Sequence, residues 1–294
     1  MLLKGNAVAK KISEENAERV SLLKEKGITP TLAIFRIGSK EADLSYERGI
    51  LKRFSECGAE VIVRVFPEDV EEKDFIDALE EADRDERIHG ILAFRPLPKR
   101  FDKDLLNRHI DPKKDVDGCT DLSLAGLFVN KELGFAPCTA QAAIEILDYY
   151  EIPISGKNIV VLGRSLVIGK PVSMMLLNRN ATVTVCHRKT QDTPSIAFKA
   201  DILVSAIGEC ENINRDYVSP HQTIIDVGIN YSEEKNRLCG DVLFEEVEPL
   251  VENITPVPGG VGSVTTSILA RHVIEAAEKT VKKSHLNCNP KSGH

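Results

Sequence analysis

A pair of glycines at the end of an apolar run has the spacing and surroundings of a phosphate-binding turn. Residues 160–162 are apolar, Gly163 and Gly169 follow, and Pro171 stands at the start of an apolar, helix-like segment. A strand that passes into a helix in this way directs the unpaired N–H groups of the helix start toward an anion. The pattern is neither a Walker A loop nor G-x-G-x-x-G. It predicts a nucleotide site, with a purely structural turn as the alternative.

Basic residues follow two of the expected strands and favour a nucleotide with extra negative charge. Arg164 comes after residues 160–162, and Arg188 and Lys189 come after residues 182–186. An NAD site usually has an acidic residue after the second strand, where it binds the ribose hydroxyl. Two guanidinium groups could instead hold a ribose 2′-phosphate, with no nearby carboxylate to oppose it. NADP is therefore favoured over NAD, unless Arg188 and Lys189 are only solvated loop charges.

Two aspartates, Asp115 and Asp117, precede Gly118 and could do several kinds of chemistry. They could bind a metal, cap a helix, or accept hydrogen bonds from the donor edge of a ligand. A metal is the poorest choice because no His or Cys lies at ligand spacing, so no metal site is predicted. One carboxylate suits an N–H/NH₂ edge such as that of a pterin, since both hydrogen bonds would be charge-assisted. An ordinary turn fits the same residues equally well.

A second loop combines prolines with glycines and is expected to face a ligand. Pro256 and Pro258 stiffen the approach, and Gly259, Gly260 and Gly262 let the backbone come close to a planar group. A simple turn between domains is the alternative.

The composition limits the classes of protein to which the chain can belong. Its 294 residues suggest two domains, and a net charge of −7 argues against nucleic acid as a partner. Seven cysteines lack C-x-x-C spacing, so we expect neither a zinc site nor a disulfide framework. We therefore expect a reducing compartment. No apolar run reaches the roughly 18 residues of a membrane span. A soluble cytoplasmic protein with no membrane partner is expected.

The elements that must position these residues alternate between strand and helix. Strands are expected at 31–37, 60–65, 90–94, 158–162, 182–186, 202–205 and 223–227. Helices are expected at 7–26, 42–57, 70–86, 139–150 and 265–282, with a frayed polar end at 283–294. This alternation predicts an α/β protein with parallel sheets covered by helices.

Taken together, these motifs resemble the methylenetetrahydrofolate dehydrogenase/methenyltetrahydrofolate cyclohydrolase family. The resemblance runs in order from about Leu2 to Ala277. It rests on Lys114-Asp-Val-Asp-Gly118, Pro137-Cys-Thr139, Gly163-Arg-Ser165 with Gly169 and Pro171, Ala181-Thr-Val-Thr-Val-Cys-His187, Ala200-Asp-Ile-Leu-Val-Ser-Ala-Ile-Gly208, Asp226-Val-Gly-Ile-Asn230, Gly240-Asp-Val242 and Thr255-Pro-Val-Pro-Gly-Gly-Val-Gly262.

The resemblance implies a fold and a set of partners. It implies a catalytic, folate-binding domain from residues 1–138 plus 266–294 and a Rossmann-like NAD(P) domain from residues 139–265, with the folate cleft between them. It also implies a homodimer, a tetrahydrofolate substrate and a place in the one-carbon metabolism that feeds purine biosynthesis.

The resemblance also assigns roles to residues. It places Gly163, Arg164, Ser165 and Ile229 at the cofactor, to which the residue pattern adds Gly169 and Arg188. It places Tyr46 and Asp117 at the folate as catalytic and binding residues, together with the loop Pro258, Gly259, Gly260, Val261 and Gly262.

Two departures from the family pattern concern catalysis. The family carries a lysine four residues after the cleft tyrosine, and here Ile50 stands at that spacing from Tyr46. The family strand ends Val-Gln-Leu-Pro-Leu-Pro, so that the glutamine supporting the lysine is replaced by Phe94. Lys52 lies about 200° around the helix from Ile50 and points away from the cleft.

A third departure concerns the cofactor. Arg188 stands where NADP-using members usually have serine, and some NAD-using relatives have an arginine there that holds inorganic phosphate. NADP is expected, and NAD with inorganic phosphate stays open.

The two family reactions place different demands on these residues. Oxidation of 5,10-methylenetetrahydrofolate removes a hydride and needs no proton abstraction, so positioning and the cofactor are sufficient. Hydrolysis of the methenyl cation needs a general acid–base group, which neither Ile50 nor Phe94 can supply. We therefore expect a dehydrogenase with weak or absent cyclohydrolase activity. The alternatives are a bifunctional enzyme with a substitute acid–base group and a non-catalytic nucleotide- or folate-binding paralogue.

Overall fold

The computed structural model describes residues 1–233 and 235–287, which form two compact units. The five-stranded unit contains Met1–Lys11, Leu127–Lys131 and Ala136–Ile268. The three-stranded unit contains Ile12–Gly126, Glu132–Phe135 and the chain from Leu269 onward. These limits differ from the expected domain limits of 1–138 plus 266–294 and 139–265, which remain a prediction.

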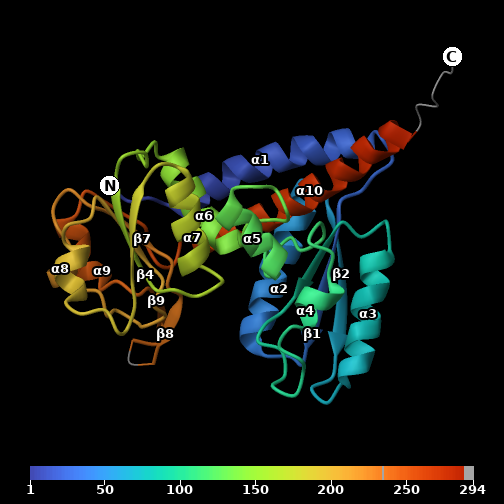
Figure 1. The fold of residues 1–294 in the computed structure, drawn as a ribbon, viewed down its shortest axis with the longest axis horizontal. Helices are drawn as coiled ribbons and strands as arrows, with labels where there is room; N and C mark the ends of the chain where they lie inside the picture. The colour runs from blue at the N-terminus through green and yellow to red at the C-terminus, as the bar shows by residue number, and fades with distance from the viewer. Residues whose placement is uncertain (234, 288–294) are drawn as a thin grey trace. The chain divides into compact units, whose positions relative to one another are not determined.

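The three-stranded unit is a parallel sheet with helices in its crossovers. Its strands lie in the order β2 (Glu60–Phe66), β1 (Thr31–Ile37), β3 (Gly90–Ala93). The connecting helices α2 (Glu41–Cys57) and α3 (Glu72–Arg84) lie on opposite sides of the sheet in Figure 1. The crossover from β1 through α2 to β2 and the crossover from β2 through α3 to β3 run in opposite directions across the sheet, so right-handed connections place the two helices on opposite faces.

Alternating side chains of the central strand build the core of this unit. Phe35 on β1 lies 5.9 Å from the ring of Phe75 on α3, and Phe75 lies 5.7 Å from Phe101. Leu32 and Ile34 point to the other face of the strand and are fully buried as well. A strand buried on both faces is nearly all apolar, which explains why 31–37 is readable from sequence.

Three helices contain residues of both units, and a fourth, short helix belongs to the three-stranded unit alone. The shared helices are α1 (Gly5–Lys24), α5 (Asp121–Val129) and α10 (Gly262–Asn287). The short helix α4 (Leu105–His109) contributes Leu105 to the core next to α3.

The five-stranded unit has a fully parallel sheet. Its order is β10 (Asn253–Ile254), β7 (Thr223–Asp226), β6 (Ile202–Ser205), β4 (Asn158–Leu162), β5 (Thr182–Cys186). The order runs outward from β4 in both directions, and loops beyond the carboxyl ends of such strands are where α/β proteins bind ligands. Leu2 extends the far edge by a parallel bridge to Ile254.

Helices cover both faces of this sheet. The helices are α6 (Cys138–Tyr149), α7 (Gly169–Asn178), α8 (Thr193–Ala197) and α9 (Phe244–Val247), with 3₁₀ turns at Arg215–Tyr217 and Glu248–Leu250. Ala197 and Val247 on α8 and α9 pack with Val160, Leu162 and Leu203 of the sheet. Helices α6 and α7 lie on the other side of it in Figure 1.

A small antiparallel hairpin stands apart from the main sheet. Its strands are β8 (Asn230–Ser232) and β9 (Arg237–Cys239), with Asn230 opposite Cys239. Tyr231 and Leu238 in the middle of these strands are both exposed.

The structure confirms the two-domain α/β fold with parallel sheets and changes several details. The hairpin, β10 and the short helices α4, α5, α8 and α9 were not predicted, because each is too short to carry a periodic pattern. Helix α10 runs to Asn287, so the expectation of a frayed end from residue 283 is wrong for 283–287. The rest of that expectation, 288–294, lies outside the described residues. In the described chain, no helix is both long enough and apolar enough to span a membrane.

A buried histidine ties helix α10 to the loop that carries the two aspartates. His272 is 2% exposed, its Nδ1 lies 2.8 Å from the carbonyl oxygen of Val116, and its ring lies 4.9 Å from that of Phe135. Burial lowers the pKa of His272 to about 4, from an ordinary value of 6.5. The folded protein therefore holds this imidazole neutral at pH values where the unfolded chain would protonate it.

We expect His272 to make the fold less stable in mild acid. Between pH 6.5 and 4 the unfolded chain binds the extra proton, so the free energy of unfolding should fall by about 2 kcal/mol from pH 7 to pH 5 on account of this group. His272→Gln keeps an N–H donor for Val116 and cannot titrate, so its stability should depend less on pH. Urea unfolding of both proteins at pH 7 and pH 5 measures the difference. Equal pH dependence in the two proteins would contradict the assignment.

Candidate functional site

The glycine turn lies between β4 and α7, and its two glycines are required by close backbone approach. Gly163 has a φ of 110°, and a Cβ at this position would overlap the carbonyl oxygen of Ala206. A Cβ at Gly169 would overlap the carbonyl oxygen of Gly163 itself. Helix α7 begins at Gly169, so Pro171 does stand in a first helical turn. The predicted strand–turn–helix is confirmed.

Ser165 holds the turn in shape. Its hydroxyl oxygen accepts hydrogen bonds from the N–H groups of Ile168, at 3.2 Å, and Gly169, at 3.5 Å. Its carbonyl accepts from the N–H of Lys170 at 3.0 Å. Ser165 and its neighbour Arg164 are exposed on the turn. The Ser165 hydroxyl therefore stabilises the turn, and Arg164 is the charged side chain among its exposed residues 164–167.

Arg188 follows β5, the neighbour of β4, but a carboxylate lies against it. The Arg188 Nη2 atom is 2.6 Å from Oε1 of Glu209, which comes from the loop after β6. The expectation that no carboxylate is near Arg188 is therefore wrong. The Arg188 side chain is 82% exposed and that of Glu209 is 35% exposed, so the pair stabilises the fold by only about 0–1 kcal/mol. A bound phosphate can compete for this guanidinium.

A pocket in the five-stranded unit contains Ile229 and the proline–glycine loop together. The cavity measures about 170 Å³. It is lined by Asp226, Val227, Gly228, Ile229, Leu238, Pro256, Val257, Pro258, Gly259, Gly260, Val261, Gly262 and Ser263. Gly259 has a φ of 102°, and the lining is mostly backbone and aliphatic carbon. A flat ligand can approach such a surface closely.

Two buried carboxylates meet at this pocket: Asp226 lines it and accepts a hydrogen bond from the N–H of Asp241, and neither was predicted as a site residue. Asp226 accepts the N–H groups of Gly228, Asp241 and Val242 at 3.0–3.1 Å. Burial raises the pKa of Asp226 to about 7. The negative charge of Asp241 raises it further, and the three backbone hydrogen bonds lower it. The two residues belong to the sequence runs 226–230 and 240–242, and nothing in those runs shows that they meet.

The second carboxylate collects donors from several loops. Asp241 accepts hydrogen bonds from the Ser205 hydroxyl, from the N–H groups of Ile207 and Glu209, and from the Asn230 amide, at 2.8–3.1 Å. Asp241 is fully buried. Four donors satisfy the carboxylate and fix the positions of the loop after β6 and the start of β8.

In the three-stranded unit the paired aspartates have separate tasks. Asp115 is fully buried and accepts the N–H groups of Cys119 and Thr120 and the hydroxyls of Thr120 and Ser123, at 2.6–3.0 Å. It therefore anchors the loop. Asp117 is half-buried, and Arg95 donates to its Oδ2 at 2.8 Å. Within the described residues, no group of three or more His, Cys, Asp or Glu side chains could hold a metal.

The residues at the family lysine and glutamine positions are apolar and packed. Ile50 is fully buried on α2, one turn after Tyr46. The Tyr46 ring lies 5.5 Å from the ring of Phe94, which follows β3. Lys52 is 80% exposed, with its Nζ 3.9 Å from Glu56. The structure thus brings Tyr46 and Phe94 together and leaves Lys52 in solvent.

Comparison with known protein families gives the chain its place. Residues 3–117 match the catalytic domain of tetrahydrofolate dehydrogenase/cyclohydrolase, and residues 137–281 match the NAD(P)-binding domain of the same family. This chain belongs to the tetrahydrofolate dehydrogenase/cyclohydrolase family. The family implied by the sequence motifs is therefore confirmed, and with it an enzyme scaffold that includes an NAD(P)-binding domain.

Relatives of the same family are similar over nearly their whole length. The bifunctional protein FolD of Alkaliphilus oremlandii (strain OhILAs) is 49% identical over 94% of this chain and 96% of its own. The FolD of Clostridium botulinum (strain Okra / Type B1) is 50% identical over 95% and 98%.

Solved structures agree with these relatives. The bifunctional FolD of Campylobacter jejuni has a TM-score of 0.92 at 37% identity, covering 95% of this chain and 99% of its own. The Trypanosoma brucei FolD, complexed with NADP cofactor and inhibitor, has a TM-score of 0.90 at 33% identity, covering 96% and 98%.

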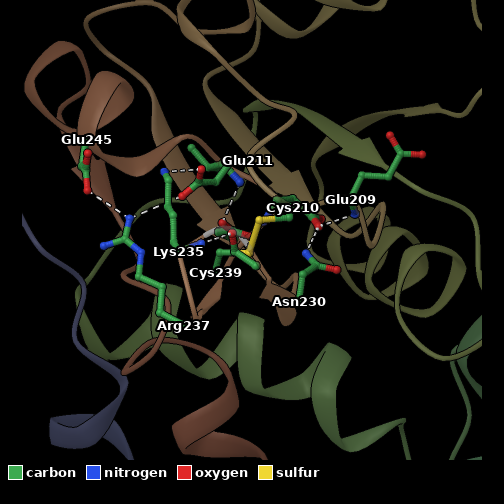
Figure 2. Close-up of a disulfide and its surroundings, with 12 residues drawn as sticks. Glu209, Cys210, Glu211, Asn230, Lys235, Arg237, Cys239 and Glu245 are labelled. Carbon is green, nitrogen blue, oxygen red and sulfur yellow. Dashed lines mark hydrogen bonds and ion pairs between the residues drawn. A yellow bond between two sulfur atoms is a disulfide. The ribbon is translucent and has the colours of Figure 1, made fainter.

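A disulfide in the five-stranded unit was not expected from this family member's sequence. Cys210, after β6, is bonded to Cys239 on β9, with 5.9 Å between the Cα atoms. Figure 2 shows the bond among the charged side chains of Glu211, Lys235 and Arg237. The expectation that the cysteines would be unpaired is wrong for this pair. Cys57, Cys119, Cys138 and Cys186 carry free thiols.

We expect this disulfide to stabilise the folded protein. It spans 29 residues of chain, so removing it should lower the free energy of unfolding by about 3 kcal/mol under oxidising conditions. Cys210→Ser should show this loss in urea unfolding, and Cys119→Ser should not. The difference between Cys210→Ser and the wild type should vanish in a thiol reductant, because the wild-type protein then has no bridge either. Seven reactive thiols in the denatured, unreduced protein would contradict the bond.

Proposed function

We propose that this chain oxidises 5,10-methylenetetrahydrofolate to 5,10-methenyltetrahydrofolate by hydride transfer to NADP, with weak or absent cyclohydrolase activity. Family membership supports the dehydrogenase reaction. The weak or absent cyclohydrolase activity is inferred from Ile50 and Phe94, which stand where that reaction needs a proton carrier.

The observation that carries this proposal is the apolar packing around Tyr46. Ile50 is fully buried and Phe94 packs its ring against Tyr46, so neither position offers an ionisable group. Hydride removal from the methylene carbon leaves a delocalised cation and transfers no proton to the protein, so this packing does not impair it. Hydrolysis needs an activated water and a proton carrier, and this packing excludes both at these two positions.

Other groups in the three-stranded unit are poor substitutes. Burial, reinforced by the Asp115 carboxylate, raises the pKa of the Cys119 thiol far above neutrality. His272 is completely buried and its ring bonds to the Val116 carbonyl. Lys52 extends into solvent beside Glu56. None of the three combines an accessible position with a proton affinity near pH 7.

The residues of the five-stranded unit fit a dinucleotide. The overlap that a Cβ would make at Gly163 and Gly169 shows a backbone turn as tight as phosphate binding requires, and Gly259 and Gly260 line an open pocket. NADP, when bound, accepts the hydride. Arg164 and Arg188 would hold its 2′-phosphate, Ser165 and Gly169 would fix the turn, and Ile229 would contact its flat ring system.

We also propose that Tyr46 and Asp117 position the folate, together with residues 258–262. Asp117 would accept hydrogen bonds from the N–H and NH₂ groups of the pterin, since a carboxylate suits two adjacent donors. The family resemblance supports a cytoplasmic homodimer and the domain limits of 1–138 plus 266–294 and 139–265.

A fully bifunctional enzyme is the second candidate, and one observation favours it. Relatives that are 49–50% identical to this chain bear the name bifunctional protein FolD. One assay distinguishes the candidates: purified protein is mixed with methylenetetrahydrofolate and NADP, then NAD, while reduced cofactor and methenyl product are followed together. Loss of methenyl product faster than its spontaneous hydrolysis would establish the second candidate. Failure to form any reduced cofactor would overturn both.

Restoring the two polar residues should restore the second reaction. General acid–base groups contribute about 10²- to 10⁴-fold to rates, so Ile50→Lys with Phe94→Gln should raise methenyl hydrolysis at least about tenfold over the wild type. Dehydrogenase turnover should change much less. Lys52→Met is the matched control and should alter neither reaction. A folded double variant without hydrolysis would show that these two positions are not the whole defect.

The cofactor assignment makes a separate prediction about Arg188 and Glu209. Arg188→Ser should raise the KM for NADP about tenfold while the KM for NAD stays constant, because a charge-assisted contact to the phosphate is lost. Glu209→Gln should lower the KM for NADP up to about fivefold by freeing Arg188. Arg215→Ser removes a similar pair, to Glu246 at 2.7 Å, and should change neither. Equal changes for NADP and NAD would contradict a phosphate contact.

A further inference from the structure

Arg95 forms an ion pair with the aspartate proposed to bind the pterin. Its Nη2 donates to Asp117 Oδ2 at 2.8 Å, across 22 residues of sequence. The Arg95 side chain is 33% exposed and that of Asp117 is 20% exposed, so the pair is partly shielded from water. Such a pair holds its two side chains more firmly than a solvated pair does.

Arg95 is placed by the strand that also carries Phe94. Phe94 follows β3 and donates its N–H to the carbonyl of Phe35 at 2.9 Å, which continues the sheet by one residue. Its ring then meets Tyr46. Arg95 is the next residue, so the group that replaces the glutamine and the group that binds Asp117 are fixed by one backbone segment.

The surroundings keep Arg95 charged. Burial lowers the pKa of its guanidinium, but the charges of Asp117 and Asp115 and the hydrogen bond to Asp117 act in the opposite direction, and the net shift is upward. A guanidinium is protonated at every pH at which the protein folds, so it can orient a carboxylate and cannot carry protons.

We propose that Arg95 is a substrate-positioning residue, which orients the Asp117 carboxylate toward the donor edge of the pterin. In this chain a fixed cation thus stands beside Asp117, while the titratable lysine of the family is replaced by Ile50. This arrangement suits a reaction that needs orientation, and Arg95 itself supplies no proton carrier. The inference rests on the proposed function for the identity of the ligand.

The test compares Arg95→Met and Arg95→Lys with the wild type. Arg95→Met should raise the KM for methylenetetrahydrofolate about tenfold, since a hydrogen bond between charged groups is lost, and leave the KM for NADP nearly constant. The acid limb of its kcat/KM profile should move to higher pH, because a carboxylate that loses a hydrogen-bonded cation is protonated more easily. Arg95→Lys keeps a cation at this position, so its KM for methylenetetrahydrofolate and its acid limb should stay close to those of the wild type.

A matched pair elsewhere in the same unit provides the control. Arg87 bonds to Asp85 at 2.8 Å but is 89% exposed, so Arg87→Met removes the same chemistry and should alter no kinetic constant. Calorimetric titration with tetrahydrofolate alone gives a readout that does not depend on turnover. Weaker tetrahydrofolate binding by Arg95→Met than by Arg87→Met is the expected result.

The outcomes separate this inference from the proposed function. Wild-type protein that binds tetrahydrofolate but reduces no NADP would overturn the proposed function and leave the role of Arg95 measurable by titration. Unchanged tetrahydrofolate affinity and an unchanged acid limb in Arg95→Met would overturn the inference alone. If Arg95→Met does not fold, Arg95→Gln replaces it and the same two measurements decide.

Discussion

Two buried carboxylates, Asp226 and Asp241, require hydrogen-bond donors, and this requirement fixes the loops at the carboxyl ends of the strands of the five-stranded unit. Asp226 and Asp241 lie out of water at the carboxyl ends of the strands, where an unpaired charge would be costly. Their donors come from the loop after β6, from the segment after β7 and from the hairpin. Asp226 thereby holds Gly228 in the lining of the pocket, and Asp241 holds Asn230, which follows the lining residue Ile229.

The same network reaches the charged rim of the proposed cofactor site. The N–H of Glu209 is bound by Asp241, and its side chain extends to Arg188. Its neighbour Cys210 is bonded to Cys239, which precedes Gly240 and Asp241 in the chain. One short loop thus connects the buried carboxylate, the disulfide and the guanidinium that would meet a phosphate. Changes at the disulfide would act on the rim through this loop.

The proposed preference for one of two linked reactions rests on the packing around Tyr46 in the three-stranded unit. Hydride transfer depends on orientation, which Arg95, Asp117 and the ring of Tyr46 would provide, in the roles proposed for them, without moving a proton. Hydrolysis depends on a group that gains and loses a proton near neutral pH. Ile50 and Phe94 fill that region with apolar packing, and Arg95 contributes a charge that does not titrate. The proposed loss of hydrolysis and the proposed retention of hydride transfer would follow from the same two residues, Ile50 and Phe94.

The sequence by itself determined the order of strands and helices, the glycine turn between β4 and α7, and the family. Those features depend on local signals, namely apolar runs buried on both faces of a sheet and glycines that backbone contact requires. Only the tertiary structure decided that Asp115 is buried and Asp117 faces Arg95, that Glu209 opposes Arg188, and that Cys210 meets Cys239. Each of these contacts joins loops that are distant in sequence. The strand order brings the partners together, and the local sequence around one partner does not indicate the other.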